Sequence, residues 1–216
     1  MSQTDSFINE VTEEVRKEQL WALIRRYGWI AAVAIILIVG GASWNEYRKA
    51  QERQRAEALG DAIITAFNQE DLQARLQDLN AVDAPEVAAP AISLMTGASA
   101  VLAEDPQAAI TALEPLASDS ALEPIYSDLA ALKLVLLGEA VPLQLREELI
   151  AQITDPGRPY RLLGLEQQIL LQLEVGETDV ALQSTQALLQ EAGVTQGLQQ
   201  RLVQLIFALG GTPENI

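Results

Sequence analysis

The feature that most constrains this chain is an uncharged run of 17 residues that begins at Gly28. As an α-helix this run would be about 25 Å long, close to the hydrocarbon thickness of a bilayer, ~30 Å. Trp29 and Trp44 stand near its two ends, where amphipathic rings favour the membrane interfaces. Since lipid offers backbone groups no partner outside the helix, we predict a transmembrane anchor at residues 28–45.

A cleavable secretory signal or a buried core helix could also contain an uncharged run of this length. A signal has a short basic leader, but residues 1–27 hold four cations and five acids, a net charge of −1. A core helix would not account for the basic and aromatic residues that bracket the run on both sides. We therefore predict an uncleaved single span, with Arg25, Arg26, Trp29 and Trp44 at its interfaces.

The segments on either side of the anchor are predicted to be helical. Residues 1–27 form a tail, part of which has the apolar spacing of an amphipathic helix; a frayed tail is the alternative. Residues 46–58 are charged and lack proline, which predicts a solvated helical stalk. Within the anchor, Gly28, Ala32 and Gly40 share one face, so a second helix could approach closely there and form an oligomer.

The rest of the chain, residues 59–216, shows a repeat. Polar breaks marked by Glu70, Glu104, Gly138 and Gly176 are separated by 34, 34 and 38 residues. Sustained alternation of apolar and polar residues, the pattern of strands, is absent. Two antiparallel helices per unit of about 34 residues is the period of a tetratricopeptide solenoid. We therefore predict an all-α chain, in which a single membrane helix precedes a degenerate tetratricopeptide-like α-solenoid.

Helical patterns lie between the polar breaks, and the last of them predicts a capping helix. Small residues such as Gly97, Ala109 and Ala181 are expected where paired helices approach closely. Large residues such as Leu113 and Leu188 are expected to fill the space between neighbouring hairpins. The predicted helices cover residues 85–103, 106–117, 121–137, 142–153, 158–174, 178–191 and 195–209.

The composition excludes several classes of function. Residues 56–216 contain 6 Lys and Arg but 23 Asp and Glu, a net charge of −17, so this part repels nucleic acid. The chain has no His and no Cys, and no Walker loop or dinucleotide fingerprint. Adjacent acids such as Glu147 and Glu148 diverge on a helix and do not form an acid/base couple. We predict no catalytic residue, no metal and no cofactor, and no enzymatic activity.

The few cations of the solenoid are the best candidates for contact with a partner protein. The turn at residues 156–161 has the sequence PGRPYR, with two arginines and a tyrosine. Ion pairing to nearby acids such as Asp155 would equally account for its arginines. Tyr126 is expected on the first helix of a hairpin, either on the concave surface or in the core. The candidate contact residues are Tyr126, Lys133, Arg158, Tyr160 and Arg161.

Three stretches resemble the bacterial YfgM-type ancillary subunits of the SecYEG translocon. They are RRYGWIAAVAIILIVGGASWNEY, DPQAAITALEPLASDSALEPIYSDLAALKLVLL and DPGRPYRLLGLEQQILLQLEVGETDVALQSTQALL. The resemblance implies a single-pass protein of the bacterial inner membrane, with a cytoplasmic tail and a periplasmic repeat domain. It also implies the Sec translocon, periplasmic chaperones or exported chains as partners. It implies no particular contact residue.

The sequence therefore predicts a membrane-anchored, non-catalytic scaffold or chaperone-like subunit. Orientation is open on charge alone, since four Lys and Arg lie within about 20 residues of the span on each side. A tethered scaffold on the cytoplasmic face is one alternative, and a repeat protein that coordinates envelope or cell-division machinery is another.

Overall fold

The computed structural model describes the backbone of residues 3–212, and all their side chains except those of residues 3–20, 22–24, 28, 31 and 32. This part of the chain is helical and has no strand, which confirms the all-α prediction. It divides into two compact units, Met1–Ala58 and Leu59–Ile216. The helices are α1 (Gln3–Phe67), α2 (Leu72–Asn80), α3 (Ala89–Leu102), α4 (Pro106–Ala117), α5 (Pro124–Val135), the 3-10 helix η1 (Gly138–Ala140), α6 (Leu143–Thr154), α7 (Arg161–Glu174), α8 (Thr178–Leu189) and α9 (Gln196–Ala208).

The described part of the first unit belongs to α1, whose last residues, 59–67, lie in the second unit. Around residues 33–39, α1 carries apolar side chains on every side. The five consecutive residues 35–39 are all large aliphatics and all exposed, at 58% to 71% of their full surface. Trp29 and Trp44 are exposed at 65% and 66%. The Arg26 guanidinium lies 5.7 Å from the centre of the Tyr27 ring. A helix that is apolar on all sides is normally buried in a protein core or in a membrane. The apolar side chains of this part of α1 are exposed in the structure.

Among the residues whose side chains are described, no helix is both long enough and apolar enough to span a membrane. Residues 28, 31 and 32 of the predicted anchor lie outside that set, as do the apolar positions of the predicted amphipathic tail. Gly28 and Ala32, two of the three small residues expected to pair helices, also lie outside it. The anchor, the amphipathic tail and the paired helix face stay predictions.

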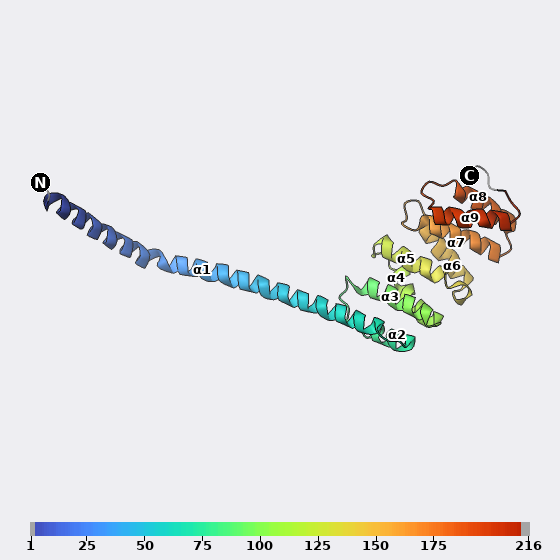
Figure 1. The fold of residues 1–216 in the computed structure, drawn as a ribbon, viewed down its shortest axis with the longest axis horizontal. Coiled ribbons are helices and arrows are strands. Elements are labelled where there is room, and N and C mark those ends of the chain that lie inside the picture. Colours follow the sequence, from blue (N-terminus) through green and yellow to red (C-terminus); the bar gives the residue numbers. More distant parts are fainter. Residues whose placement is uncertain (1–2, 213–216) are drawn as a thin grey trace. The chain divides into compact units, whose positions relative to one another are not determined.

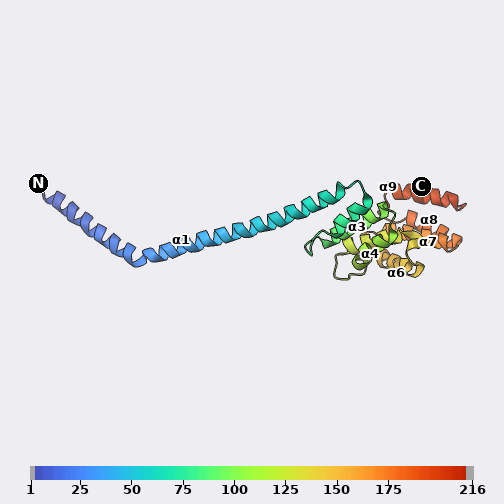
Figure 2. The same ribbon diagram turned by 90° about the horizontal axis from the view of Figure 1, so that it is seen from below.

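The second unit is a stack of helical hairpins. From α2 to α9 each helix contacts the next along the chain, and α3, α5 and α7 also contact one another in that order (Figures 1 and 2). Two antiparallel helices per repeat, with the first helices of successive repeats in contact, is the arrangement of a tetratricopeptide-like solenoid. The last helix, α9, packs on α8, at the place predicted for a cap.

Three of the four polar breaks that mark the repeats have the same backbone conformation just after the first helix of a hairpin. Glu104, Gly138 and Gly176 all have positive φ angles, 54°, 59° and 86°. At the ends of α3 and α7 the amides of Asp105 and Glu177 then donate to carbonyls five residues earlier, which closes a Schellman motif. Glycine adopts this left-handed conformation without steric cost, so the glycines are where the chain can turn most easily.

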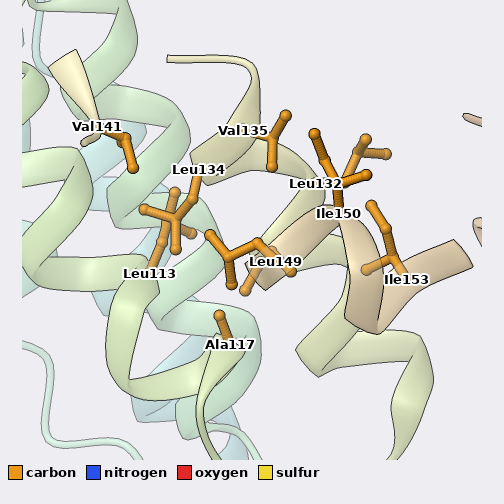
Figure 3. Close-up of a cluster of buried hydrophobic side chains, with 11 residues drawn as sticks. Leu113, Ala117, Leu132, Leu134, Val135, Val141, Leu149, Ile150 and Ile153 are labelled. Atoms are coloured by element: carbon orange, nitrogen blue, oxygen red, sulfur yellow. The ribbon is translucent and has the colours of Figure 1, made fainter. Parts of the chain in front are cut away.

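The described interior contains three apolar clusters, of which the smallest joins α2, α3 and α4 through Leu76, Ala100 and Ala109. The first joins α4, α5 and α6, and Figure 3 shows Leu113, Leu134 and Leu149 meeting at its centre. The second joins α7, α8 and α9 through Ile169, Leu188 and others. Leu113 and Leu188 are almost fully buried, as predicted for residues that fill the space between helices.

Close approach of neighbouring helices depends on glycine at two positions, one within a hairpin (α3 with α4) and one between successive hairpins (α6 with α7). A Cβ atom on Gly97 of α3 would lie 2.6 Å from Cγ of Leu113 on α4, and one on Gly164 of α7 would lie 2.7 Å from Cγ1 of Ile153 on α6. Ala109 is fully buried as well. The prediction of small residues at these contacts is therefore confirmed.

Replacing Gly97 by alanine is expected to lower the free energy of unfolding by about 1–3 kcal/mol, because the added methyl overpacks the α3–α4 contact. Gly60 is the matched control. It also lies within a helix but has no neighbouring atom within 4 Å, so Gly60→Ala should stabilise by up to about 1 kcal/mol. Urea unfolding of the full-length protein followed by circular dichroism measures both. Equal effects of the two substitutions would contradict the role of close packing at Gly97.

Candidate functional site

Four of the five arginines of the second unit, Arg146, Arg158, Arg161 and Arg201, pair with carboxylates from other elements of the fold, whereas Arg75 donates to backbone carbonyls. Three of them bind a carboxylate through two nitrogens at once, a geometry that fixes both side chains. The nitrogen–oxygen distances are 2.6 and 2.6 Å for Arg146 to Glu174, 3.0 and 3.2 Å for Arg161 to Glu191, and 2.6 and 2.7 Å for Arg201 to Glu166.

Helix α7 is the centre of these pairs. Its first residue, Arg161, binds just beyond the end of α8, its Glu166 binds α9, and its last residue, Glu174, binds α6. Hydrogen bonding to Arg146 lowers the pKa of Glu174, and hydrogen bonding to Arg161 lowers the pKa of Glu191. Both carboxylates are therefore stabilised in the ionised form, and the pairs tie the last two hairpins and the cap together.

A fourth pair is buried between α5 and the loop before α7. Asp128 of α5 is completely buried, and its Oδ1 lies 2.6 Å from Nη2 of Arg158. Arg158 Nε also donates to the carbonyl of Gln152, whose side chain donates to the carbonyl of Ala117 at the end of α4. Burial raises the pKa of Asp128, and the positive charge of Arg158 offsets part of that rise. Thus one polar network joins α4, α5, α6 and the following loop.

The structure changes the predicted ion-pair partner of Arg158. We considered Asp155, three residues away, but the Arg158 side chain binds Asp128, and only its backbone amide reaches Asp155, through the carbonyl. The reason is geometric. The loop at 155–160 folds back over α5, so a residue 30 positions earlier in the sequence is nearer to the guanidinium than its own neighbour is.

The five predicted contact residues lie in different surroundings. Tyr126, on α5, is exposed at 38%, and Lys133, in the last turn of α5, is partly buried and forms no salt bridge within the described residues. Tyr160 packs against the first apolar cluster. Arg158 and Arg161 are engaged in the intramolecular pairs described above. Tyr126 and Lys133 thus share a helix, whereas the side chains of the PGRPYR turn contact other parts of the repeat domain. Contact with a partner stays a prediction for all five.

Three hollows lie beside the first helices of the hairpins. The largest, about 540 Å³, lies along α3 between α2 and α4, and Ile92, Thr96 and Pro115 are among its lining residues. The second, about 250 Å³, lies between α6 and α7, and the third, about 190 Å³, between α7 and α8. Gln168 of α7 borders both of the smaller hollows. The solenoid therefore offers recessed surface on which another chain could pack.

The sequence contains one signal for the pairs that our sequence interpretation missed. The partners in the four pairs are 28 to 35 residues apart, close to one repeat. Opposite charges separated by about one repeat unit face each other because neighbouring hairpins stack in register. The same spacing could have identified Asp128 as the partner of Arg158. The hollows, by contrast, leave no comparable pattern in the sequence.

The grouping of the acidic side chains and the causes of their pKa shifts bear on whether the described residues could form a metal site. No group of three or more His, Cys, Asp or Glu side chains there could hold a metal ion. The carboxylates with shifted pKa are accounted for by burial or by an arginine partner. The surroundings of these groups therefore point to structural pairing.

Comparison with known proteins identifies one family. Residues 22–140, more than half of the chain, match the model of the tetratricopeptide repeat-like domain family. No curated protein matches the chain, and no solved structure does. The match covers the predicted anchor, the stalk and the hairpins as far as η1.

Removing the cation from the buried pair tests its role. Arg158→Gln should lower the free energy of unfolding by about 2–3 kcal/mol near neutral pH, because Asp128 is left charged and buried. This loss is smaller than that for breaking a fully buried pair, because Arg158 is partly exposed. The matched double variant Asp128→Asn with Arg158→Gln should recover most of this loss, since it buries no charge.

The loss of unfolding free energy caused by Arg158→Gln should also depend on pH. Because burial raises the pKa of Asp128, its ionisation costs stability above that pKa, and the cost disappears as the pH falls through it. Without Arg158 the pKa rises further, so the difference from the wild type should shrink between about pH 7 and about pH 5. Glu174 and Glu191, with lowered pKa values, stay ionised over this range. Urea unfolding at both pH values measures the effect, and a pH-independent difference would contradict it.

Proposed function

Since the chain belongs to the tetratricopeptide repeat-like domain family, we propose that it is a membrane-anchored, non-catalytic scaffold that binds other proteins through its helical repeats. The observation that carries the proposal is the solenoid of α2–α9. Its stacked hairpins leave recessed surface beside the first helices, while four of its six cations form ion pairs within the domain. Repeat proteins of this kind use such extended surfaces for binding.

The proposed anchor is the stretch at residues 28–45. Exposed aliphatic side chains surround this part of α1, and Trp29 and Trp44 stand at its ends, as they do at membrane interfaces. Anchoring would confine the repeat domain to a thin layer beside the bilayer and raise the effective concentration of partners there. Weak contacts would then suffice for binding.

The proposed location is the bacterial inner membrane, with residues 1–27 in the cytoplasm and the repeat domain in the periplasm. The proposed partners are the Sec translocon and the chaperones or exported chains that it meets. The support is the resemblance of three stretches to YfgM-type translocon subunits, together with the absence of Cys, which is compatible with an oxidising compartment.

The equal numbers of flanking cations favour no orientation, so a scaffold on the cytoplasmic face is the second candidate. A reporter fused after Ile216 separates the two. Alkaline phosphatase activity, which requires export, is expected if the repeat domain is periplasmic. Activity of a cytoplasmic reporter at the same position would assign the opposite orientation.

Membrane anchoring is tested by charging the apolar part of α1. Ile36→Lys with Val39→Lys should release the full-length protein from membranes on carbonate extraction, because each lysine at the centre of a span costs about 3 kcal/mol. Ala50→Lys with Ala56→Lys, in the charged stretch beyond the predicted span, is the matched control and should stay in the membrane pellet. Release of the wild type by carbonate would overturn the anchor.

Protein binding is tested by photo-crosslinking in intact cells. A photoreactive residue at Tyr126 or at Lys133 on α5 should capture other proteins, because these side chains reach the surface of a first helix. The same residue at Leu134, which is fully buried, is the control and should capture none. Failure to capture any protein from exposed positions along α3, α5 and α7 would contradict the scaffold function.

A further inference from the structure

Two exposed carboxylates and one buried polar atom without a hydrogen-bond partner line the hollow between α6 and α7. Glu147 and Glu177 line it, and neither side chain forms a salt bridge or a side-chain hydrogen bond within the described residues. The Oε1 atom of Gln172, which also lines the hollow, is buried and receives no hydrogen bond. All three groups offer acceptor oxygens, while the donors among the lining side chains are only the amide nitrogens of Gln168 and Gln172, so the hollow contains no cation.

The nearest cation of this chain cannot fill that need. Arg146 is next to Glu147 in the sequence, and their charges interact. However, both terminal nitrogens of Arg146 are bound to Glu174, at 2.6 Å each. A buried acceptor without a donor costs free energy, so a ligand that brings N–H groups would be stabilised there.

The walls of the hollow are aliphatic. Ile150 and Ala151 of α6 face Leu171 and Val175 at the end of α7 across a volume of about 250 Å³. A hollow with aliphatic walls and carboxylates at its rim matches one common chemical group, a basic side chain. Lysine and arginine bury an aliphatic stem while their charged head stays at the surface.

We propose that this hollow binds a lysine or arginine side chain of a partner polypeptide. The stem packs against Ile150 and Val175, the cation lies by Glu147 and Glu177, and Gln172 accepts a hydrogen bond. The proposal rests on the protein-binding function above and specifies the chemistry of the segment bound: a basic residue within an otherwise apolar stretch.

The neighbouring hollow shows why the basic residue is expected at this place. The hollow between α7 and α8 shares Gln168 with it, but its charged residues, Arg161 and Glu191, already bind each other. The charges that line the hollow between α7 and α8 therefore balance, so this hollow does not favour a basic side chain. The net charge of −17 on residues 56–216 attracts a basic segment from a distance, and the unpaired carboxylates would then select its position.

The test uses the full-length protein in uncharged detergent and two labelled model peptides. Both peptides have an apolar core that differs only at its centre, which is lysine in one and norleucine in the other. Fluorescence anisotropy at about 0.1 M salt measures their dissociation constants. The wild type should bind the lysine peptide about tenfold more tightly than the norleucine peptide.

The variant Glu147→Gln with Glu177→Gln should weaken binding of the lysine peptide about tenfold and remove the preference for lysine. The matched control is Glu148→Gln with Asp179→Asn. It changes the same net charge at neighbouring positions outside the hollow, and it should alter binding by less than about twofold. An equal effect of the two double variants would overturn the site in favour of non-specific attraction. Equal binding of both peptides by the wild type would overturn it as well.

Failure of this site and failure of the scaffold function are distinguishable. Captured proteins at Tyr126 together with no lysine preference in the peptides would overturn the basic-residue site and leave the scaffold function in place. Absence of captured proteins from all exposed positions of the solenoid would overturn the scaffold function, on which the site depends.

Discussion

The structure of the repeat domain depends on how closely its paired helices can approach. At Gly97 and Gly164 the missing side chain is replaced by a large aliphatic residue of the neighbouring helix, Leu113 or Ile153. Such contacts have little tolerance, because protein interiors are packed as densely as organic crystals. The apolar clusters on either side of them form only if the hairpins stack at this distance. Consequently the spacing of α3 against α4 and of α6 against α7 is fixed by these contacts.

Electrostatic pairing adds a second layer to this packing. The arginines of the domain are few. After residue 140, three of them connect a hairpin with the next loop, hairpin or cap, and the Arg161–Glu191 pair joins the two ends of the α7–α8 hairpin. This leaves the outer surface of residues 56–216 with a large excess of unpaired carboxylates. The arrangement thus serves two purposes: the cations hold the solenoid together, and the remaining acids favour basic partners. Asp128 differs from the other paired acids, because its burial opposes its own ionisation.

Most of the fold could be predicted from local patterns. The first helices of the hairpins end two or three residues before Glu104, Gly138 and Gly176. These residues were predicted to mark the repeats, because glycine and polar residues interrupt the apolar spacing. Predicted helix starts differ from the observed ones by up to four residues, as at Ala89, where the chain after Pro85 first makes a turn. The candidate site was harder to predict. Arg158 and Arg161 were predicted to contact a partner protein, which stays a prediction, and their partners within this chain lie about a repeat away in the sequence.

The sequence by itself determined the uncharged run near the N-terminus, the helical repeat with its small residues at close contacts, and the acidic charge of the domain. These properties depend on residue identity and spacing along one helix or one hairpin. Only the tertiary structure decided that Arg158 meets Asp128, that α7 is the centre of the ion pairs, and that Glu147 and Glu177 border one hollow. Each of these depends on the rotation and stacking of one hairpin against the next, and that geometry results from packing the whole interface rather than from any single stretch of the sequence.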